Sequence, residues 1–225
     1  MAAVAEAEVA SPSLTAESGV VSLPHVAWET YERLLADDEE RRVPRLTYDR
    51  GVLEAVSPSP EHEEDADTLR LIVMLVSAAL GIPIRRLGAT AFRRRDVQRG
   101  FEADGSFYIQ HEPLVRGRRN FDLAVDPPPD LVVEIEVCRS AISKLPLYAA
   151  MGVPEVWRSD GAAVVIHLLA GDVYRTAGAS AALPILTAER LTRLLRESRR
   201  LPSPDWARAV TEWAVAGETG STPHD

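Results

Sequence analysis

The residues of this chain that could do metal chemistry begin with acidic side chains spaced along one predicted strand. Residues 130–136 read Asp-Leu-Val-Val-Glu-Ile-Glu. Because alternate residues of a strand share a face, Asp130, Glu134 and Glu136 point the same way, and Val132 interrupts them. Carboxylates on one face of an apolar strand need a cation, a proton or a wet cleft. The pattern favours a cation site, but a sheet end that exposes glutamates to solvent would have the same sequence.

The single lysine of the chain follows this strand. The sequence has 24 arginines and one lysine, Lys144. A compact ammonium can approach a scissile phosphate or hold an attacking water, where a planar guanidinium presents a wider fork. With Ser140 as the predicted N-cap, Lys144 lies early in a helix and Tyr148 one turn later on the same face. Both side chains can therefore point back over the strand end. The alternative is that the single lysine has no functional role, because it must occupy some position in any case.

A further carboxylate, Asp104, precedes the strand-like run SFYI. Mg²⁺ prefers hard oxygen ligands, usually one or two carboxylates, with water and substrate phosphate in the other octahedral positions. Asp104 and Glu134 would supply that pair. The alternative is structural, because Asp before Gly105 is also a common turn sequence.

A sheet and its flanking helices must position these residues. The segment 60–80 begins acidic and becomes apolar, as expected of the main core helix. Before it, RLTYDRGVLEAVSP predicts a hairpin; after it come short strands, a helix over 140–151, three more strands and two C-terminal helices. We expect an α/β fold: a single domain over 23–216 with one mixed central sheet flanked by helices. Asp104 and Glu134 should lie on adjacent strands, with the 140–151 helix beside them.

Composition is that of an ordinary globular protein, with 225 residues and 46% hydrophobic content. Residues 1–22 and 217–225 predict disordered tails, because they are small, polar and poor in aromatic residues. No apolar run is long enough for a membrane span, and the acidic N-terminus does not resemble a secretory signal. The lone Cys138 excludes an internal disulfide. We therefore expect a cytoplasmic protein.

The charge distribution bears on the class of partner. A net charge of −9 argues against a polyanion, because DNA affinity depends largely on Lys and Arg. However, the segment from Arg85 to Arg119 has nine arginines and four acids. This segment predicts either a salt-sensitive nucleic-acid surface or a solvated arginine-rich face.

The order of four segments resembles a known family. EADGSFYI, PPPDLVVEIEV, SKLPLYAAMGVPEVWR and GDVY are similar to the bacterial Uma-two family of restriction endonucleases, within the PD-(D/E)XK nuclease superfamily. The resemblance covers residues 25 to 200. It implies a PD-(D/E)XK nuclease-like fold, with Asp104 and Glu134 as metal ligands and Lys144 as the catalytic lysine.

Further site residues follow from the same resemblance. Glu136 stands where the simpler motif has its lysine, and His62 matches the family's histidine at the start of the long helix. Ala103 replaces the usual proline before the first acid. His62 and Tyr148 could act at the site or be structural.

The resemblance implies a Mg²⁺-dependent endonuclease, with Mn²⁺ as a possible substitute, that hydrolyses phosphodiester bonds of DNA. One alternative is a non-catalytic module that binds nucleic acid or protein on the same fold. Another is a metal-dependent hydrolase of small phosphate esters, which a closed pocket would favour. A homodimer is also expected, because endonucleases that cut both strands often use two-fold symmetry.

Overall fold

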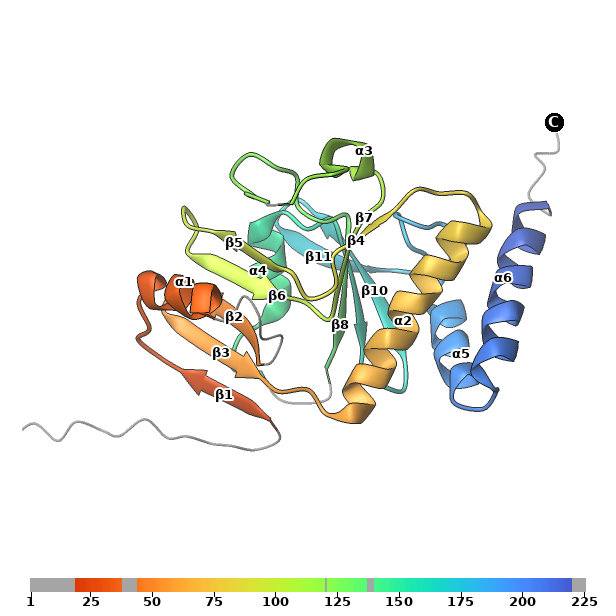
Figure 1. Ribbon diagram of the computed structural model, residues 1–225, viewed down its shortest axis with the longest axis horizontal. Coiled ribbons are helices and arrows are strands. Elements are labelled where there is room, and N and C mark those ends of the chain that lie inside the picture. Colours follow the sequence, from red (N-terminus) through yellow and green to blue (C-terminus); the bar gives the residue numbers. More distant parts are fainter. Residues whose placement is uncertain (1–18, 38–43, 120, 137–139, 220–225) are drawn as a thin grey trace, which may run out of the picture.

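The computed structural model describes residues 19–37, 44–119, 121–136 and 140–219. Within these ranges the strands form two sheets, where the sequence predicted one. The smaller sheet lies beside the larger one, at the left of Figure 1, and helices flank the larger sheet. The predicted mixed α/β class is confirmed, but the N-terminal hairpin belongs to a separate sheet. The sequence could not indicate this, because hairpin signals are local and the sheet that a hairpin joins depends on distant contacts.

The larger sheet has the strand order β11-β10-β9-β8-β7-β4. Its strands are β4 (Arg85–Arg86), β7 (Gly105–Tyr108), β8 (Leu131–Ile135), β9 (Glu155–Ser159), β10 (Val164–Ala170) and β11 (Val173–Ala177). Only the β8–β9 pair among these neighbours is parallel. The smaller sheet, of order β1-β3-β2-β6-β5, is antiparallel. Its strands are β1 (Val20–Leu23), β2 (Arg45–Asp49), β3 (Val52–Val56), β5 (Ala91–Arg94) and β6 (Arg99–Glu102).

The helices are α1 (Trp28–Asp37), α2 (Pro60–Ala79), α3 (Glu112–Val115), α4 (Lys144–Met151), α5 (Ala188–Ser198) and α6 (Ser203–Thr219). The start of α2 follows from its sequence. Ser59 caps it by accepting a hydrogen bond from the backbone N–H of His62, and Pro60 occupies the first turn, where its missing N–H costs nothing. None of the helices in the described ranges is long and apolar enough to cross a membrane.

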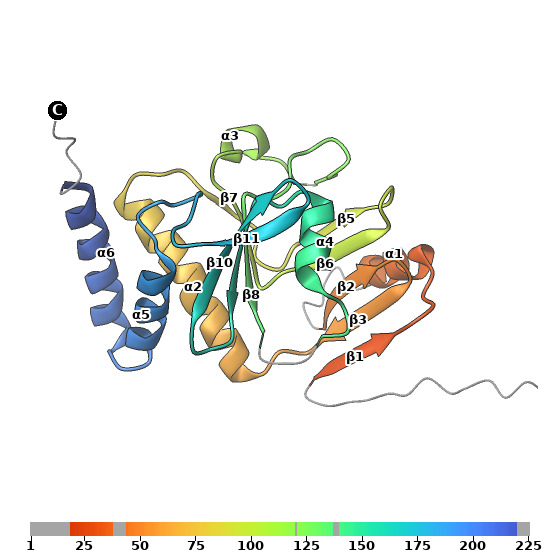
Figure 2. The ribbon, with the colours of Figure 1, turned by 180° about the vertical axis from the view of Figure 1, so that it is seen from behind.

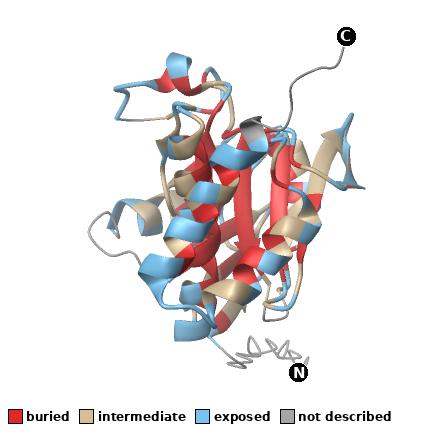
Figure 3. Cartoon of the chain, turned by 90° about the vertical axis from the view of Figure 1, so that its right-hand side faces the viewer, coloured by how far each residue is buried: buried red, intermediate tan, exposed pale blue. Residues whose placement is uncertain are grey.

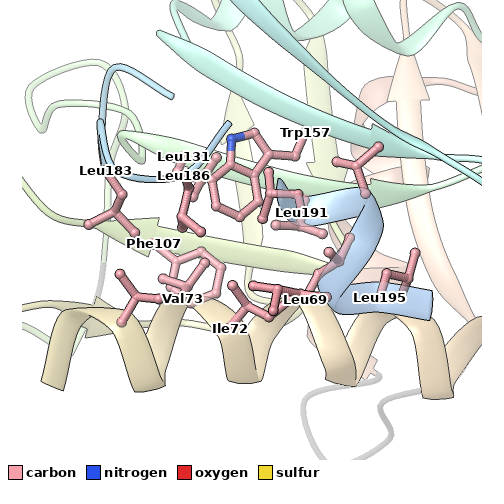
Figure 4. Close-up of a cluster of buried hydrophobic side chains, with 14 of the residues drawn as sticks. Leu69, Ile72, Val73, Phe107, Leu131, Trp157, Leu183, Leu186, Leu191 and Leu195 are labelled. Atoms are coloured by element: carbon pink, nitrogen blue, oxygen red, sulfur yellow. The ribbon is translucent and has the colours of Figure 1, made fainter. Parts of the chain in front are cut away.

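The main core lies between α2, α5, α6 and one face of the larger sheet. Figure 4 shows its centre, formed by Leu69, Ile72, Val73, Phe107, Leu131, Trp157, Leu183, Leu186, Leu191 and Leu195. Figure 3 shows the buried strands behind helices whose outer faces are exposed. This packing fixes the position of α2 relative to β7 and β8, and so of the residues at their ends.

The opposite face of β8 is also buried. Seen from behind in Figure 2, α4 lies on the side of the sheet away from α2. Its Leu147, Tyr148 and Met151 belong to the same buried cluster as Val132 and Val156 of the sheet. Burial on both faces explains why β8 is a nearly continuous apolar run. A carboxylate on this strand must therefore be satisfied by hydrogen bonds within the protein.

The predicted tails need correction at their inner ends. Residues 20–22, assigned to the N-terminal tail, belong to β1, because this strand pairs in register with β3 and so satisfies its backbone. At the other end, α6 continues to Thr219, beyond the predicted limit of 216. Most of the predicted tails, residues 1–18 and 220–225, lies outside the described residues.

Candidate active site

The candidate site lies where β7 begins and β8 ends. The two strands are antiparallel neighbours, with Gly105 opposite Val133. Asp104 immediately precedes Gly105, and Glu134 follows Val133. The register therefore brings both carboxylates to the same end of these two strands. The two strands are adjacent as expected, and Glu134 lies on β8, but Asp104 lies one residue before β7 and not on it.

Asp104 is a buried carboxylate with a donor on each oxygen. Its side chain is 4% exposed. Oδ2 accepts a hydrogen bond from the backbone N–H of Ile135 at 2.7 Å, which extends the β7–β8 pairing by one side-chain contact. Oδ1 contacts the guanidinium of Arg45 and lies 2.8 Å from Nε2 of His62. Arg70 donates to the backbone carbonyl of the same residue at 2.6 Å. Asp104 is therefore held at a fixed place by strand, helix and ion pair.

Glu134 is more deeply buried, with 1% of its side chain exposed. The ammonium of Lys144 lies 2.6 Å from Oε2, and the hydroxyl of Tyr148 donates to Oε1. Burial, followed by the negative charge of Glu134, raises the pKa of the Tyr148 phenol well above its ordinary value. Tyr148 is therefore a neutral donor at physiological pH. The expectation that Lys144 and Tyr148 point back over the strand end is confirmed.

The start of α4 differs from the prediction. Its N-cap is Ser143, so Lys144 is the first helical residue, and Ser140 is not the cap. Ser140 instead donates its hydroxyl to Glu54 at 2.8 Å, and the backbone N–H of Ala141 donates to the same carboxylate at 2.8 Å. Because buried Glu54 lies on β3, these contacts tie the approach to α4 to the smaller sheet.

The first turn of α2 supplies two more groups. His62 is buried, and burial first, then the positive charge of Arg45, lowers its pKa below the ordinary value. His62 is therefore a neutral imidazole at physiological pH, and its Nε2 lies 2.8 Å from Oδ1 of Asp104. Glu63, half-exposed, contacts the second amino group of Arg45.

Two other predicted acids have different surroundings. Glu136 forms an ion pair with Arg158, and its side chain is 33% exposed at the edge of the site. Asp130, at the other end of β8, accepts backbone hydrogen bonds from Ile109 at 2.7 Å and His111 at 2.9 Å. The acids of this strand therefore do not point into one common site, and Asp130 needs no cation.

A cavity of about 490 Å³ lies against Asp104, Lys144 and Glu136, whereas Glu134 and Tyr148 lie behind its lining. Its lining includes four acids, Glu54, Glu102, Asp104 and Glu136, together with three nitrogen-containing side chains, Arg45, His62 and Lys144. In the part of the chain that the structure describes, no group of three or more His, Cys, Asp or Glu side chains is placed to hold a metal ion. Two neighbouring carboxylates suffice for Mg²⁺ when water and phosphate supply the other oxygens. The donor chemistry of Asp104 and Glu134 fits such an ion.

Arg45 contacts Asp104 directly, although no sequence pattern predicts it as a site residue. The two residues are 59 positions apart and belong to different sheets. One arginine among 24 carries no local signal. Its exposure of 8% distinguishes it only once the fold is known.

Comparisons with known proteins agree with this architecture. Residues 28–202 match the family model Uma2, described as "Putative restriction endonuclease". No curated protein is significantly similar in sequence. Among solved structures, the fold is similar to that of a "putative nuclease belonging to DUF820" from Anabaena variabilis. That similarity has a TM-score of 0.50 at 14% sequence identity and covers 76% of this chain and 99% of the other.

Proposed function

Because the chain belongs to this family of restriction-endonuclease-like proteins, we propose that it is a Mg²⁺-dependent endonuclease that hydrolyses phosphodiester bonds of DNA. Mn²⁺ is the expected substitute. One observation carries the proposal: Lys144 lies 2.6 Å from Glu134, at the strand end where Asp104 also lies. This is the acid, acid and lysine set that the sequence resemblance implied, brought together from three separate segments.

In the proposed reaction, Asp104 and Glu134 would hold the cation. When bound, a divalent ion polarises a phosphate oxygen and lowers the pKa of water. Lys144 holds the attacking water through its ammonium and offsets negative charge at the phosphate. Tyr148 fixes the orientation of Glu134, and neutral His62 does the same for Asp104. Glu136, at the rim and paired with Arg158, contributes negative charge rather than a direct contact.

Cleavage of supercoiled plasmid DNA tests the proposal. The purified protein should convert supercoiled to nicked or linear DNA with Mg²⁺ or Mn²⁺, and EDTA should abolish the conversion. Asp104→Asn and Glu134→Gln keep the size of each side chain and remove ligand charge, so both should lose metal binding together with cleavage. Unchanged cleavage by both variants would contradict the assignment.

A non-catalytic module that binds nucleic acid or protein is the second candidate. It is favoured by the internal donors that already occupy both carboxylates, and the net charge of −9 favours a protein over DNA as its partner. The two candidates differ in whether bound DNA is cleaved. Binding of labelled duplex without cleavage, over a series of divalent metals, would support the module.

A hydrolase of small phosphate esters is the third candidate, because the cavity lies within the range of small-molecule sites. Turnover of bis(p-nitrophenyl) phosphate without any action on DNA would support it. The homodimer expected from the sequence stays a prediction, which light scattering would check.

A further inference from the structure

Arg45 is a buried cation in the centre of the site, and the proposed reaction gives this residue no role. It lies on β2 of the smaller sheet and reaches across to the larger one. One amino group contacts Oδ1 of Asp104, and the other contacts Oε1 of Glu63. Its side chain is 9% exposed and lines the cavity. A buried guanidinium is therefore in contact with a carboxylate that the proposed metal also needs.

The two oxygens of Asp104 are not equivalent. Oδ2 is bound to the backbone of Ile135 and belongs to the sheet. Oδ1 contacts two side chains, Arg45 and His62. A carboxylate oxygen offers about two lone-pair directions, so both directions of Oδ1 are occupied. A cation can reach this oxygen only by displacing one of them.

Of the two, Arg45 is the group that a cation would displace. Its guanidinium carries the same sign of charge as the cation, whereas the backbone of His62 is fixed in the first turn of α2 by its N–H bond to Ser59. Arg45 also has a second partner. Glu63 is 40% exposed, so the guanidinium can keep this contact while it turns away from Asp104 into the cavity.

We propose that Arg45 is an exchangeable internal counter-ion, such that its contact with Asp104 and the binding of a divalent cation at Asp104 exclude each other. The proposal rests on the proposed function, because it takes Asp104 as a metal ligand. After exchange, the charge at Asp104 is still compensated, and the released guanidinium faces the cavity, where a substrate phosphate is its natural bidentate partner.

The test measures Mn²⁺ affinity in the absence of DNA, by electron paramagnetic resonance or calorimetry. Arg45→Met should bind Mn²⁺ about tenfold more tightly than the unmodified protein, within the 5- to 150-fold range typical of coupled sites. Arg70→Met is the matched control: Arg70 donates to the backbone carbonyl of Asp104 at 2.6 Å, so this variant removes a positive charge near Asp104 without freeing its carboxylate. Arg70→Met should change the affinity by about twofold at most, as expected for a partly exposed charge.

Equal affinity of Arg45→Met and the unmodified protein would overturn the inference. So would an equal gain in Arg70→Met, since the effect would then be one of general charge. Asp104→Asn separates this inference from the proposed function. If that variant binds Mn²⁺ as the unmodified protein does, then Asp104 is not a ligand and the proposed metal site fails.

A second variant keeps the test decisive if Arg45→Met does not fold. Glu63→Gln removes the partner that holds the displaced guanidinium, so Mn²⁺ binding should weaken several-fold. Its control is Asp67→Asn, one turn further along α2, where an acid pairs with Arg70 at 2.8 Å. Equal effects of the two variants would overturn the exchange.

Discussion

At the scale of single residues, the structure depends on how two buried carboxylates are satisfied. Glu134 has one charged and one neutral donor, Lys144 and Tyr148, on successive turns of the same helix. Asp104 has a backbone donor from the neighbouring strand and side-chain partners from two other elements. A buried carboxylate without such partners would be strongly destabilising. The same contacts that allow these acids to be buried also fix their orientation.

Tyr148→Phe tests the neutral donor. The change leaves Oε1 of a buried carboxylate without its hydroxyl partner, so the free energy of unfolding should fall by about 1–3 kcal/mol or somewhat more for a charged acceptor. Tyr174→Phe is the control, because the Tyr174 hydroxyl donates to an uncharged acceptor, the carbonyl of Val153, at 2.6 Å. Urea denaturation of both variants provides the measurement. An equal or smaller loss of unfolding free energy in Tyr148→Phe would contradict this. The hydrogen bond to charged Glu134 would then stabilise the protein no more than one to an uncharged carbonyl.

At the scale of elements, the site requires the two sheets to meet. The smaller sheet supplies Arg45 from β2, and the larger sheet and its helices supply the other groups. Next to Arg45, the backbone N–H of Leu46 donates to Glu102 at 2.5 Å, so β2 and β6 are joined at the cavity. Trp28 and Tyr31 of α1 share a buried cluster with Leu46 of β2, so a change in this packing should affect the site as well as stability.

Gly100→Ala tests that packing. A methyl group at Gly100 of β6 would lie 2.2 Å from the hydroxyl oxygen of buried Tyr31 on α1. The helix and strand would have to separate, at a cost of about 1–3 kcal/mol. Gly178→Ala is the control, because its methyl group would meet no heavy atom within 4 Å. Thermal unfolding compares the two, and equal midpoints would contradict the close approach.

The sequence predicted the elements whose signals are local. The 60–80 helix matches α2 to within one residue, because its cap, its proline and its apolar face lie within the segment itself. Alternation along 130–136 correctly separated the apolar face of β8 from the face of Glu134. Lys144 was identified because it is the only lysine of the chain.

The parts that sequence could not predict depend on contacts between distant segments. Ser140 is a good N-cap by type, but the carboxylate of Glu54, 86 positions away, binds its hydroxyl. Arg45 has no feature that distinguishes it from other arginines until β2 is placed beside Asp104. The same limit applies to the two sheets, since neither hairpins nor alternation indicate which sheet a strand joins.

At the scale of the whole molecule, the question is where a polyanion could bind. The predicted basic run from 85 to 119 is largely neutralised, because five of its arginines are in ion pairs: Arg94, Arg95, Arg99, Arg116 and Arg118. By contrast, a groove of about 450 Å³ along α5 and its end is lined by three arginines, Arg193, Arg196 and Arg200, and by two acids, Glu189 and Glu197. Among the described residues, none of these three has a carboxylate within 4 Å.

The end of α5 lies against the first half of α2. Arg199 at the end of α5 binds Asp65 of α2 at 2.6 Å, one turn from His62. Figure 1 shows the end of α5 and the start of α2 toward the same lower edge of the molecule, whereas α3 lies at the opposite end. A duplex held at the candidate site could therefore extend along α5.

Replacing Arg193, Arg196 and Arg200 together by Gln should weaken binding of duplex DNA and make it less salt-dependent. Each lost phosphate contact reduces the log–log salt slope by about 0.9. The matched control replaces Arg94, Arg95 and Arg116 by Gln in the basic run predicted from sequence. Fluorescence anisotropy over a salt series measures both. A larger effect of the control triplet would favour the surface predicted from sequence instead.

The central claim is that Lys144, beside Glu134 and Asp104, acts as a compact charge in phosphodiester hydrolysis. The most direct test is the rate of Mg²⁺-dependent nicking of plasmid DNA by Lys144→Arg, with Lys144→Met as the null variant and circular dichroism as the folding control. Lys144→Arg keeps a positive charge beside buried Glu134, so it should fold and bind the cation, yet cleave about 10²- to 10⁴-fold more slowly, as is typical when a proton-transfer or electrostatic group is lost. Lys144→Met removes that charge and should therefore also be less stable, so its cleavage is compared at a temperature where circular dichroism shows it folded. Nicking by Lys144→Arg at the rate of the unmodified protein would contradict the account, because a simple ion pair with Glu134 tolerates either cation.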